Sequence, residues 1–214
     1  MCKGCTHNRS SVPGGVMHDD SQNMSDEEIV SMALRDKAFF GHIVMRYENK
    51  LSAYIMRLGI RNVEDRQDTL QDIFIKVYKN LNGFDKTLSF SSWVYRIAHN
   101  EAISAYRKKN VRPEGHLIDA GNEHVAREMT KEEDAEKHFD EKLNAAEVYK
   151  ALQLVDEKYK NALILRFFEH KEYEEISDIL KIPTGSVGTL IHRGKKQLRE
   201  KVDTKQIDIG TKIN

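Results

Sequence analysis

The chain is poor in proline and contains no sustained alternation of apolar and polar residues. Its 214 residues include only 3 Pro and 12 Gly, so few positions are expected to interrupt a helix. Alternation with a period of two marks a half-buried strand, and its absence argues against a sheet. These two deficits predict an all-α fold.

Long apolar runs are missing as well. No stretch approaches the roughly 20 apolar residues that a membrane-spanning helix requires, and the first residues lack the apolar centre of a secretion signal. The sequence therefore predicts a cytoplasmic protein without membrane insertion. An apolar fraction of 39% is nevertheless large enough for buried cores.

The chain also lacks a net charge: its formal charge is +0. A neutral chain at first argues against a nucleic-acid partner. The charges are unevenly distributed, however. Residues 93–113 hold five cations against one acid, and residues 190–202 again hold five against one, so each segment carries a net +4. Residues 114–147 hold four cations against eleven acids, a net −7. Two basic segments joined by an acidic connector indicate surfaces that can meet phosphates.

Composition divides the chain into two helical domains with tails. Residues 1–24 are rich in Ser, Gly, Asn and Asp without a period, which predicts a disordered tail. Apolar periodicity predicts helical domains at 25–110 and 140–202. The acidic stretch 111–139 is interpreted as a flexible linker, with a linker that follows a basic channel on a partner as the alternative. Residues 203–214 form a polar tail that is expected to fray.

The only two cysteines, Cys2 and Cys5, lie in the N-terminal tail with His7 close behind. A CxxC pair followed by a histidine can bind zinc, but a second pair of well-spaced ligands is missing. We therefore expect no bound metal and no cofactor, and zinc at the tail stays open as the alternative.

Two amphipathic helices separated by a polar loop, residues 82–89, occupy the stretch from Asp65 to Asn110. In the first helix these apolar residues recur at spacings of three and four: Leu70, Ile73, Phe74, Val77, Tyr78 and Leu81. In the second helix these polar residues repeat at the same spacing: Arg96, Asn100, Ser104 and Arg107. Upstream, Ser25 and Glu28 fit a capping box that begins a first helix, and Gly59 is expected to end a second one. A helix with one buried face and a basic stripe elsewhere can lie against a phosphate backbone.

The second domain ends in a short helix, a three-residue turn and a longer basic helix. The short helix is predicted from Tyr173 to Leu180, and Lys181-Ile182-Pro183 form the turn. The longer helix is predicted to start at Thr184 or Ser186, with Thr184 able to cap it, and to run to about Val202. This is the order of a helix-turn-helix, whose second helix enters the major groove of DNA.

Both halves together resemble the extracytoplasmic-function (ECF) sigma factors, a branch of the bacterial RNA polymerase sigma factors. DRQDTLQDIFIKVYKNLNGFD followed by FSSWVYRIAHNEAISAYRKK is similar to region 2 of that family. DEKYKNALILRFFEHKEYEEISDILKIPTGSVGTLIHRGKKQLREKV is similar to region 4. The resemblance implies a transcription initiation factor that binds core RNA polymerase, recognises the −10 and −35 promoter elements and promotes melting. It implies contacts with the β′ clamp helices and the β flap, and an anti-sigma factor as a further partner.

Residue roles are also implied by this resemblance, motif position by motif position. Polymerase binding is expected of Asp68, Gln71, Asp72 and Phe74. Binding of the −10 element, with capture of a flipped base, is expected of Asn82, Phe84, Asp85, Lys86, Ser89, Arg96, Asn100, Arg107 and Lys108. Binding of the −35 element is expected of Thr184, Gly185, Ser186, Gly188, Thr189, His192, Arg193 and Lys196. No residue is expected to be catalytic, because the polymerase performs the chemistry.

The chain departs from the family pattern at several positions. Lys171-Glu172 replaces the common Leu-Ser before the short helix, which is expected to weaken its N-cap. Gly188 stands where a basic residue is frequent, and Gly194 stands where Ala is usual. Each interior Gly costs a helix about 1 kcal/mol relative to Ala, so a softer recognition helix with one contact fewer is expected.

Two other functional classes are alternatives to this hypothesis. One is a DNA-binding regulator that uses only the helix-turn-helix, with a sensing or dimerising N-terminal domain. The other is a carboxylate-based metal hydrolase built on Asp68 and Asp72, which lack a nucleophile or metal partner nearby in the pattern. Trp93 is interpreted as a core residue, and His99 and His192 as surface or DNA-facing donors.

Overall fold

The computed structural model describes residues 24–111 and 145–210, and within these ranges every regular element is a helix. The N-terminal unit contains α1 (Asp26–Arg35), η2 (Lys37–Phe39), α2 (Phe40–Arg57), α3 (Val63–Asn80), η3 (Leu81–Gly83) and α4 (Phe90–Val111). The C-terminal unit contains α6 (Ala145–Leu152), α7 (Glu157–Phe167), α8 (Tyr173–Leu180) and α9 (Thr184–Gly210). The predicted all-α fold is confirmed for the part of the chain that is described.

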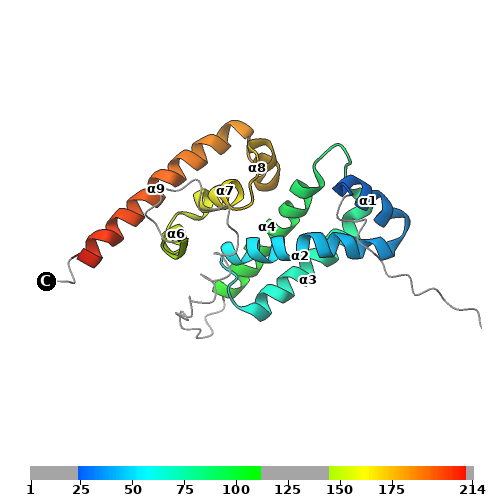
Figure 1. Cartoon of the computed structure of the whole chain (residues 1–214), viewed down its shortest axis with the longest axis horizontal. Helices are drawn as coiled ribbons and strands as arrows, with labels where there is room; N and C mark the ends of the chain where they lie inside the picture. Colours follow the sequence, from blue (N-terminus) through cyan, green and yellow to red (C-terminus); the bar gives the residue numbers. More distant parts are fainter. Residues whose placement is uncertain (1–23, 112–144, 211–214) are drawn as a thin grey trace, which may run out of the picture.

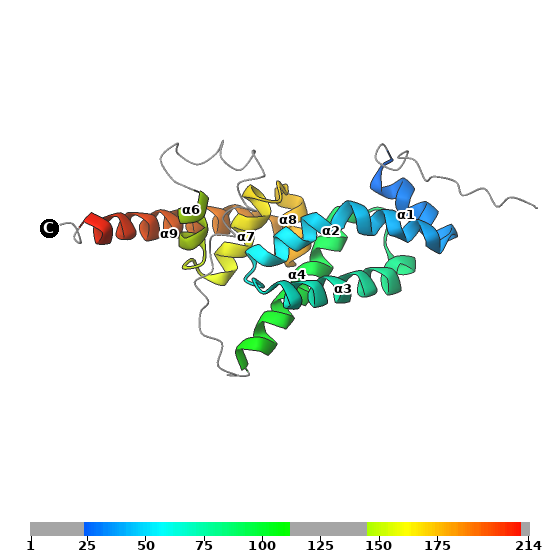
Figure 2. The same ribbon diagram turned by 60° about the horizontal axis from the view of Figure 1, so that its bottom comes forward.

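The N-terminal unit is a bundle in which α2 and α3 lie side by side and α4 crosses them (Figures 1 and 2). Its core is formed by side chains that are at most 1% exposed: Ile43, Leu51, Tyr54, Ile55, Ile73, Val77, Phe90, Val94 and Ala98. These residues come from the apolar faces of three helices, so the spacing of three and four in the sequence is confirmed as the origin of the core. Tyr78 is an exception, since its side chain is 41% exposed.

The helix ends follow local capping rules. Ser25 and Glu28 form the predicted capping box, because each side chain accepts from the other residue's backbone N–H. Asn62 caps α3 by accepting the Asp65 N–H at 2.9 Å, which starts this helix slightly before the predicted position. Gly59 follows α2 with a φ of +120°, a conformation that glycine adopts without the steric cost of a side chain. The prediction that α2 ends here is therefore confirmed.

The C-terminal unit packs α6, α7 and α8 against the first half of α9, whose far end extends away from the body (Figures 1 and 2). Its core consists of side chains that are at most 1% exposed: Ala151, Leu152, Ala162, Leu163, Ile164, Leu165, Ile176, Ile179 and Val187. Helix α9 continues past Val202 to Gly210, so the predicted end of this helix was too early. The two units also contact each other, and their buried apolar residues form one continuous cluster.

Candidate nucleic-acid interface

The outward face of α3 carries three of the four residues to which polymerase binding was assigned. Asp68, Gln71 and Asp72 are exposed and spaced by three and four residues, so they share one side of the helix. Phe74 is half-buried and packs against the core. Phe74 therefore packs on the core side of α3, whereas the three polar residues face solvent.

Two apolar residues beside these acids did not enter the sequence prediction of this face. Ile75 and Tyr78 are each 41% exposed, and both lie on the solvent side of α3. Ile75 could have been recognised, since it is the apolar residue that breaks the three-and-four pattern. Tyr78 is predicted to lie on the buried face, but its side chain is largely accessible and forms a T-shaped contact with Phe40, with ring centroids 5.0 Å apart. An exposed apolar pair among acids is typical of a surface that binds another protein.

The loop between α3 and α4 is held in a defined turn. The Asp85 carboxylate accepts from the Thr87 backbone N–H at 2.9 Å and from the Thr87 hydroxyl at 2.8 Å. These hydrogen bonds lower the pKa of Asp85, which therefore stays ionised. Asn82 and Lys86 are exposed on either side of this carboxylate. An Asx turn of this type fixes the loop conformation through hydrogen bonds between neighbouring residues.

Two residues of the predicted −10 set, Phe84 and Ser89, stabilise the loop and the start of α4. Phe84 is 7% exposed and packs against both Phe90 and Trp93, with ring centroids 5.3 Å and 5.2 Å away. Its ring therefore does not face solvent in this structure, and it anchors the loop to the core. Ser89 accepts the Ser92 N–H at 3.3 Å and so caps the start of α4. Trp93 is a core residue, as predicted, with 9% exposure.

A polar stripe follows α4 away from the core. Arg96 is half-buried, whereas Asn100, Arg107 and Lys108 are exposed. The structure therefore places the four residues on accessible turns of one helix, with Arg96 nearest the Asp85 loop and Arg107 and Lys108 towards the far end of α4. His99 does not belong to this stripe, because its Nδ1 lies 3.1 Å from the buried Tyr54 hydroxyl. Burial, with a smaller effect of Arg107, lowers the pKa of His99 from 6.5 to about 4, so the interpretation of His99 as a surface donor is wrong.

The helix-turn-helix is formed by α8, a tight turn and α9. Lys181 ends α8 in the left-handed conformation with φ 56°, and the Ser177 hydroxyl donates to the Ile182 carbonyl at 2.6 Å across the turn. Thr184 is the first residue of α9 and its hydroxyl donates to Ser177, so it does not cap the helix as predicted. At the start of α8, Glu175 accepts the Glu172 N–H at 3.0 Å. The replacement of Leu-Ser by Lys-Glu therefore leaves this helix start with a capping partner.

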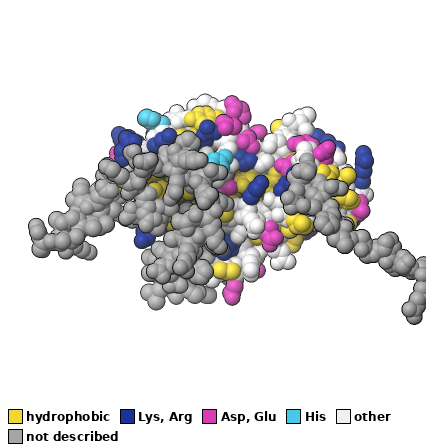
Figure 3. All heavy atoms as spheres, in the orientation of Figure 1, with side chains coloured by type: hydrophobic (Ala, Val, Ile, Leu, Met, Phe, Trp, Pro, Cys, Tyr) yellow, Lys and Arg dark blue, Asp and Glu magenta, His cyan; other side chains and the backbone are white. Residues whose placement is uncertain are grey.

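The outer face of α9 presents most of the predicted −35 residues. Exposed positions are Thr184, Gly185, Thr189, His192, Arg193 and Lys196, and half-buried positions are Ser186 and Gly188. Arg193, with a smaller effect of Lys158, lowers the pKa of the nearby Tyr159 phenol. Lys and Arg side chains are visible along the edge where α9 runs (Figure 3). Cations on an exposed second helix of a helix-turn-helix are typical of a helix that binds in the major groove of DNA.

Gly194 has a packing reason that the sequence did not reveal. A Cβ atom at this position would lie 3.0 Å from two side-chain carbons of Leu163 and 3.2 Å from Tyr159 Cβ. Leu163 is 1% exposed, so it has little room to move. The glycine thus permits the close approach of α9 to α7, and the expected softening of the helix is accompanied by tighter packing.

Within residues 24–111 and 145–210, no group of three or more His, Cys, Asp or Glu side chains is placed to hold a metal ion. Cys2, Cys5 and His7 lie outside these ranges, as does the predicted acidic linker. None of the described helices combines the length and the apolar character that crossing a membrane requires.

Family comparisons match both units. The model "Sigma-70 region 2" matches residues 43–112, and the model "Sigma-70, region 4" matches residues 145–198. The chain is 33% identical over 187 residues to the ECF RNA polymerase sigma factor SigW of Bacillus subtilis, covering 84% of this chain and 97% of the relative. It is 29% identical over 186 residues to the ECF RNA polymerase sigma-E factor of Haemophilus influenzae, covering 85% and 97%.

Solved structures share the fold. CnrH in complex with the cytosolic domain of CnrY superposes with a TM-score of 0.63 at 20% identity, covering 84% of this chain and 97% of that chain. The sigma factor RpoE of Bartonella quintana, in complex with the anti-sigma factor NepR, gives a TM-score of 0.55 at 19% identity, covering 77% and 96%. Both confirm the helical architecture over nearly the whole length of the compared chains.

Proposed function

The chain belongs to the ECF family of RNA polymerase sigma factors, and from this premise we propose how its helices divide the work. It acts as an alternative sigma factor in transcription initiation, binding core RNA polymerase and promoter DNA. The observation that carries the finer proposal is the presence of two separate exposed polar surfaces on the N-terminal unit, on α3 and on α4 with its loop. A regulator that used only a helix-turn-helix would leave the region 2 match without a role.

Helix α3 is proposed to bind the β′ clamp helices. Asp68, Gln71 and Asp72 supply a polar, acidic row, and Ile75 and Tyr78 add exposed apolar area beside it. Acids give charge complementarity and orientation, whereas an aromatic and a branched side chain supply the buried contact that holds an interface together. Phe74 supports this helix from the core side.

The Asp85 loop and α4 are proposed to recognise and open the −10 element. The turn that Asp85 and Thr87 form is fixed before DNA arrives, which lowers the ordering cost of binding. A flipped base costs a few kcal/mol of stacking, and the basic stripe with Arg96, Arg107 and Lys108 can offset it through phosphate contacts. In this proposal Phe84 contributes indirectly, because it holds the loop against the core.

The exposed start of α9 is proposed to read the −35 element in the major groove. Arg193 is the candidate for a base contact, because it is exposed on the outward side of α9 and a guanidinium can donate to the edge of a guanine base. Lys196 lies one turn nearer the middle of the helix and is suited to a phosphate. His192 and Thr189 complete the outward face.

The remaining assignments are proposed on the family membership. The region 2-like domain at 25–110, the linker at 111–139 and the region 4-like domain at 140–202 are the proposed division of the chain. Because the two similar structures are complexes with the cytosolic domain of CnrY and with the anti-sigma factor NepR, we propose that an anti-sigma factor also binds this chain. Polymerase binding through the β flap, a cytoplasmic location and the lack of any catalytic role of its own complete the proposal.

The experiment is transcription reconstituted from core polymerase and the purified chain, with start sites mapped to return both promoter elements. Replacing Asp72 by Arg should weaken core binding in a pull-down and reduce transcription, because it places a cation in the acidic row. Glu48→Arg is the matched control, an exposed acid on α2 away from that row. Equal core binding by the two variants would remove α3 from the interface, and failure of the wild type to bind core would reject the function.

A further inference from the structure

Gly188 is an interior helical glycine that neither the backbone nor the packing of the chain requires. It is the fifth residue of α9, and its φ does not lie in the left-handed region that favours glycine. A Cβ atom at this position would lie 3.5 Å from Cε2 of Tyr173, which is an ordinary van der Waals distance. An interior glycine destabilises a helix relative to alanine. The fold therefore gains nothing from the missing side chain, in contrast to Gly194 with its close packing and Gly59 with its positive φ.

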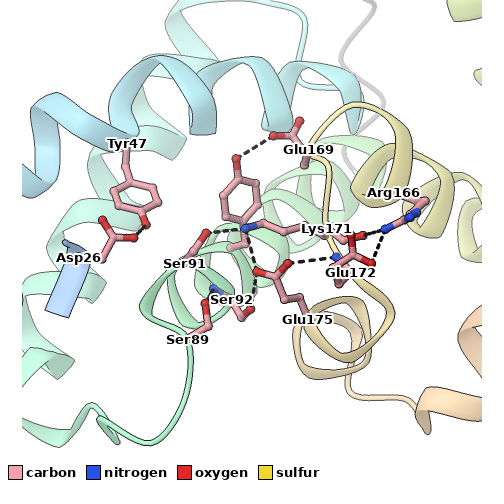
Figure 4. Close-up of polar contacts among 11 residues, drawn as sticks. Asp26, Tyr47, Ser89, Ser91, Ser92, Arg166, Glu169, Lys171, Glu172 and Glu175 are labelled. Atoms are coloured by element: carbon pink, nitrogen blue, oxygen red, sulfur yellow. Dashed lines mark hydrogen bonds and ion pairs between the residues drawn. The ribbon is translucent and has the colours of Figure 1, made fainter. Parts of the chain in front are cut away.

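The missing side chain leaves an unfilled position beside an aromatic ring that is itself held in place. Tyr173 is the first residue of α8 and is 38% exposed. The Arg166 guanidinium lies 5.5 Å from the centre of this ring, and it also donates to the Lys171 carbonyl at 3.0 Å and pairs with Glu172 at 2.8 Å (Figure 4). We call the space over Gly188 and beside the Tyr173 ring the Gly188 notch.

The Gly188 notch lies among the residues that are proposed to face the −35 element. Residues three and four positions apart share one face of a helix, so Gly188 lies between Gly185 and His192, which are both exposed. A Cβ atom at Gly185 would meet no atom of the described residues within 4 Å. Two positions of this face thus carry no side chain, and glycine permits a close approach of the backbone to a ligand. The first turns of α9 can therefore come nearer to a base edge than a helix with side chains at both positions.

The chemistry of the Gly188 notch is apolar. Glycine has no side-chain donor or acceptor, and the N–H of an interior helical residue is already bonded to the carbonyl four residues earlier. Tyr173 lines the notch with a ring carbon. A polar base edge placed here would lose its water without gaining a partner, which is unfavourable. The apolar group that base pairs present in the major groove is the 5-methyl group of thymine.

We propose that the Gly188 notch receives the 5-methyl group of one thymine in the −35 element, which makes Gly188 and Tyr173 specificity-determining residues. This inference rests on the proposed function and deepens it. The notch selects its base by shape and by the absence of hydrogen-bonding groups, whereas the neighbouring Arg193 is suited to hydrogen bonds with a base edge. Burial of one methyl group corresponds to about a fourfold gain in affinity.

Replacing thymine by uracil in the promoter tests the notch without changing base pairing. Core polymerase with the full-length chain is titrated, in gel shifts, against the promoter that start-site mapping returns. Each thymine of the −35 element, on either strand, is replaced in turn by deoxyuridine, which removes only the 5-methyl group. One of these replacements should weaken binding about fourfold. With a C·G pair at that position, 5-methylcytosine should bind more tightly than cytosine, because the methyl group returns at the same place on the ring.

Gly188→Ala should abolish this preference for thymine. Its methyl group occupies the place of the thymine methyl, so the thymine promoter should bind the variant at least about fourfold more weakly than it binds the wild type. The uracil promoter should bind both proteins equally, because the notch holds one methyl group and not two. This double-mutant cycle separates the contact from any general change in affinity. The variant gains helix propensity, so the loss does not arise from unfolding.

The Tyr173 ring and a distant glycine supply the remaining comparisons. Tyr173→Phe keeps the ring and should keep the ratio of thymine to uracil affinity, whereas Tyr173→Ser removes the wall and should reduce this ratio to below about twofold. Gly41→Ala is the matched control, since Gly41 is exposed in the first turn of α2 and a Cβ atom there meets no atom of the described residues within 4 Å. Circular dichroism verifies that every variant retains its helices.

The outcomes separate this inference from the function on which it rests. Failure of the wild-type holoenzyme to bind or transcribe any promoter would overturn the proposed function, and the notch with it. Where the wild type does bind and transcribe, three results would overturn the notch alone: a −35 element without thymine, equal affinity for thymine and uracil at every position, or a thymine preference that persists in Gly188→Ala. A preference that Gly188→Ala and Tyr173→Ser remove, and that Gly41→Ala retains, supports the notch.

Discussion

Alanine at Gly194 and at Gly188 should change stability in opposite directions, although both glycines lie in the same helix. Replacing an interior helical Gly by Ala gains about 1 kcal/mol of helix propensity at either position. At Gly188 the added Cβ would lie 3.5 Å from a Tyr173 ring carbon, an ordinary contact, so this gain should be realised in full. Gly188→Ala should therefore raise the free energy of unfolding by about 1 kcal/mol.

At Gly194 the new methyl group would meet Leu163 at 3.0 Å, well inside the ~3.5–4.0 Å at which carbon atoms attract. Leu163 belongs to the core and cannot move without displacing its neighbours. Overpacking of this kind costs about 1–3 kcal/mol, which equals or exceeds the gain in propensity. Gly194→Ala should therefore lower the free energy of unfolding by up to ~2 kcal/mol.

Urea unfolding followed by far-ultraviolet circular dichroism is the appropriate assay, because it reports on the helices of both units. The only Trp, Trp93, lies in the N-terminal unit, so its fluorescence serves as an internal reference for the half that is not mutated. If Gly194→Ala stabilised the chain as much as Gly188→Ala, the close-packing explanation of Gly194 would be refuted.

Two further outcomes are expected. Arg193→Ala should weaken binding to a −35 duplex by roughly 1–3 kcal/mol in gel-shift titrations, whereas Lys158→Ala, which removes the other cation beside Tyr159, should not; equal losses would exclude a base contact by Arg193. In the folded chain the pKa of His99 is about 4, below its ordinary value of 6.5. Between these two values the unfolded chain binds a proton at His99 that the folded chain does not bind. The free energy of unfolding should therefore fall by up to ~1.4 kcal/mol per pH unit as the pH is lowered from 6.5 to 4. His99→Gln should flatten this dependence in urea titrations, and an unchanged slope would assign the loss to other groups.

Local patterns predicted most of what is local in the structure. The Ser25 capping box, the ends of α2 and α4, and the apolar faces follow from residue types a few positions apart, and these were recognised. Errors arose where one residue type suits two environments. Tyr78 and His99 combine apolar area with a polar function, so the sequence alone does not decide which side of a helix buries them.

Contacts between distant parts of the chain were beyond sequence reasoning altogether. Glu169 lies 112 positions from Arg57, and nothing in either neighbourhood marks them as a pair. Lys171 was noted only as a departure from a family pattern, with a weakened cap as its expected consequence. Its ammonium instead connects α4 to the C-terminal unit. Such a role becomes visible only when the packing of one unit against the other is known.

Different sides of helix α4 serve different contacts. Its core side holds Phe90 and Val94, its polar stripe begins at Arg96, and its first turn binds Lys171 through Ser91. A substitution in this first turn therefore disturbs the contact between Ser91 and Lys171, which joins the two units, as well as the loop next to the −10 stripe (Figure 4). Loss of the Ser91 hydroxyl should accordingly weaken the packing of α8 against α4, so a change in promoter affinity at this position does not by itself identify a DNA contact.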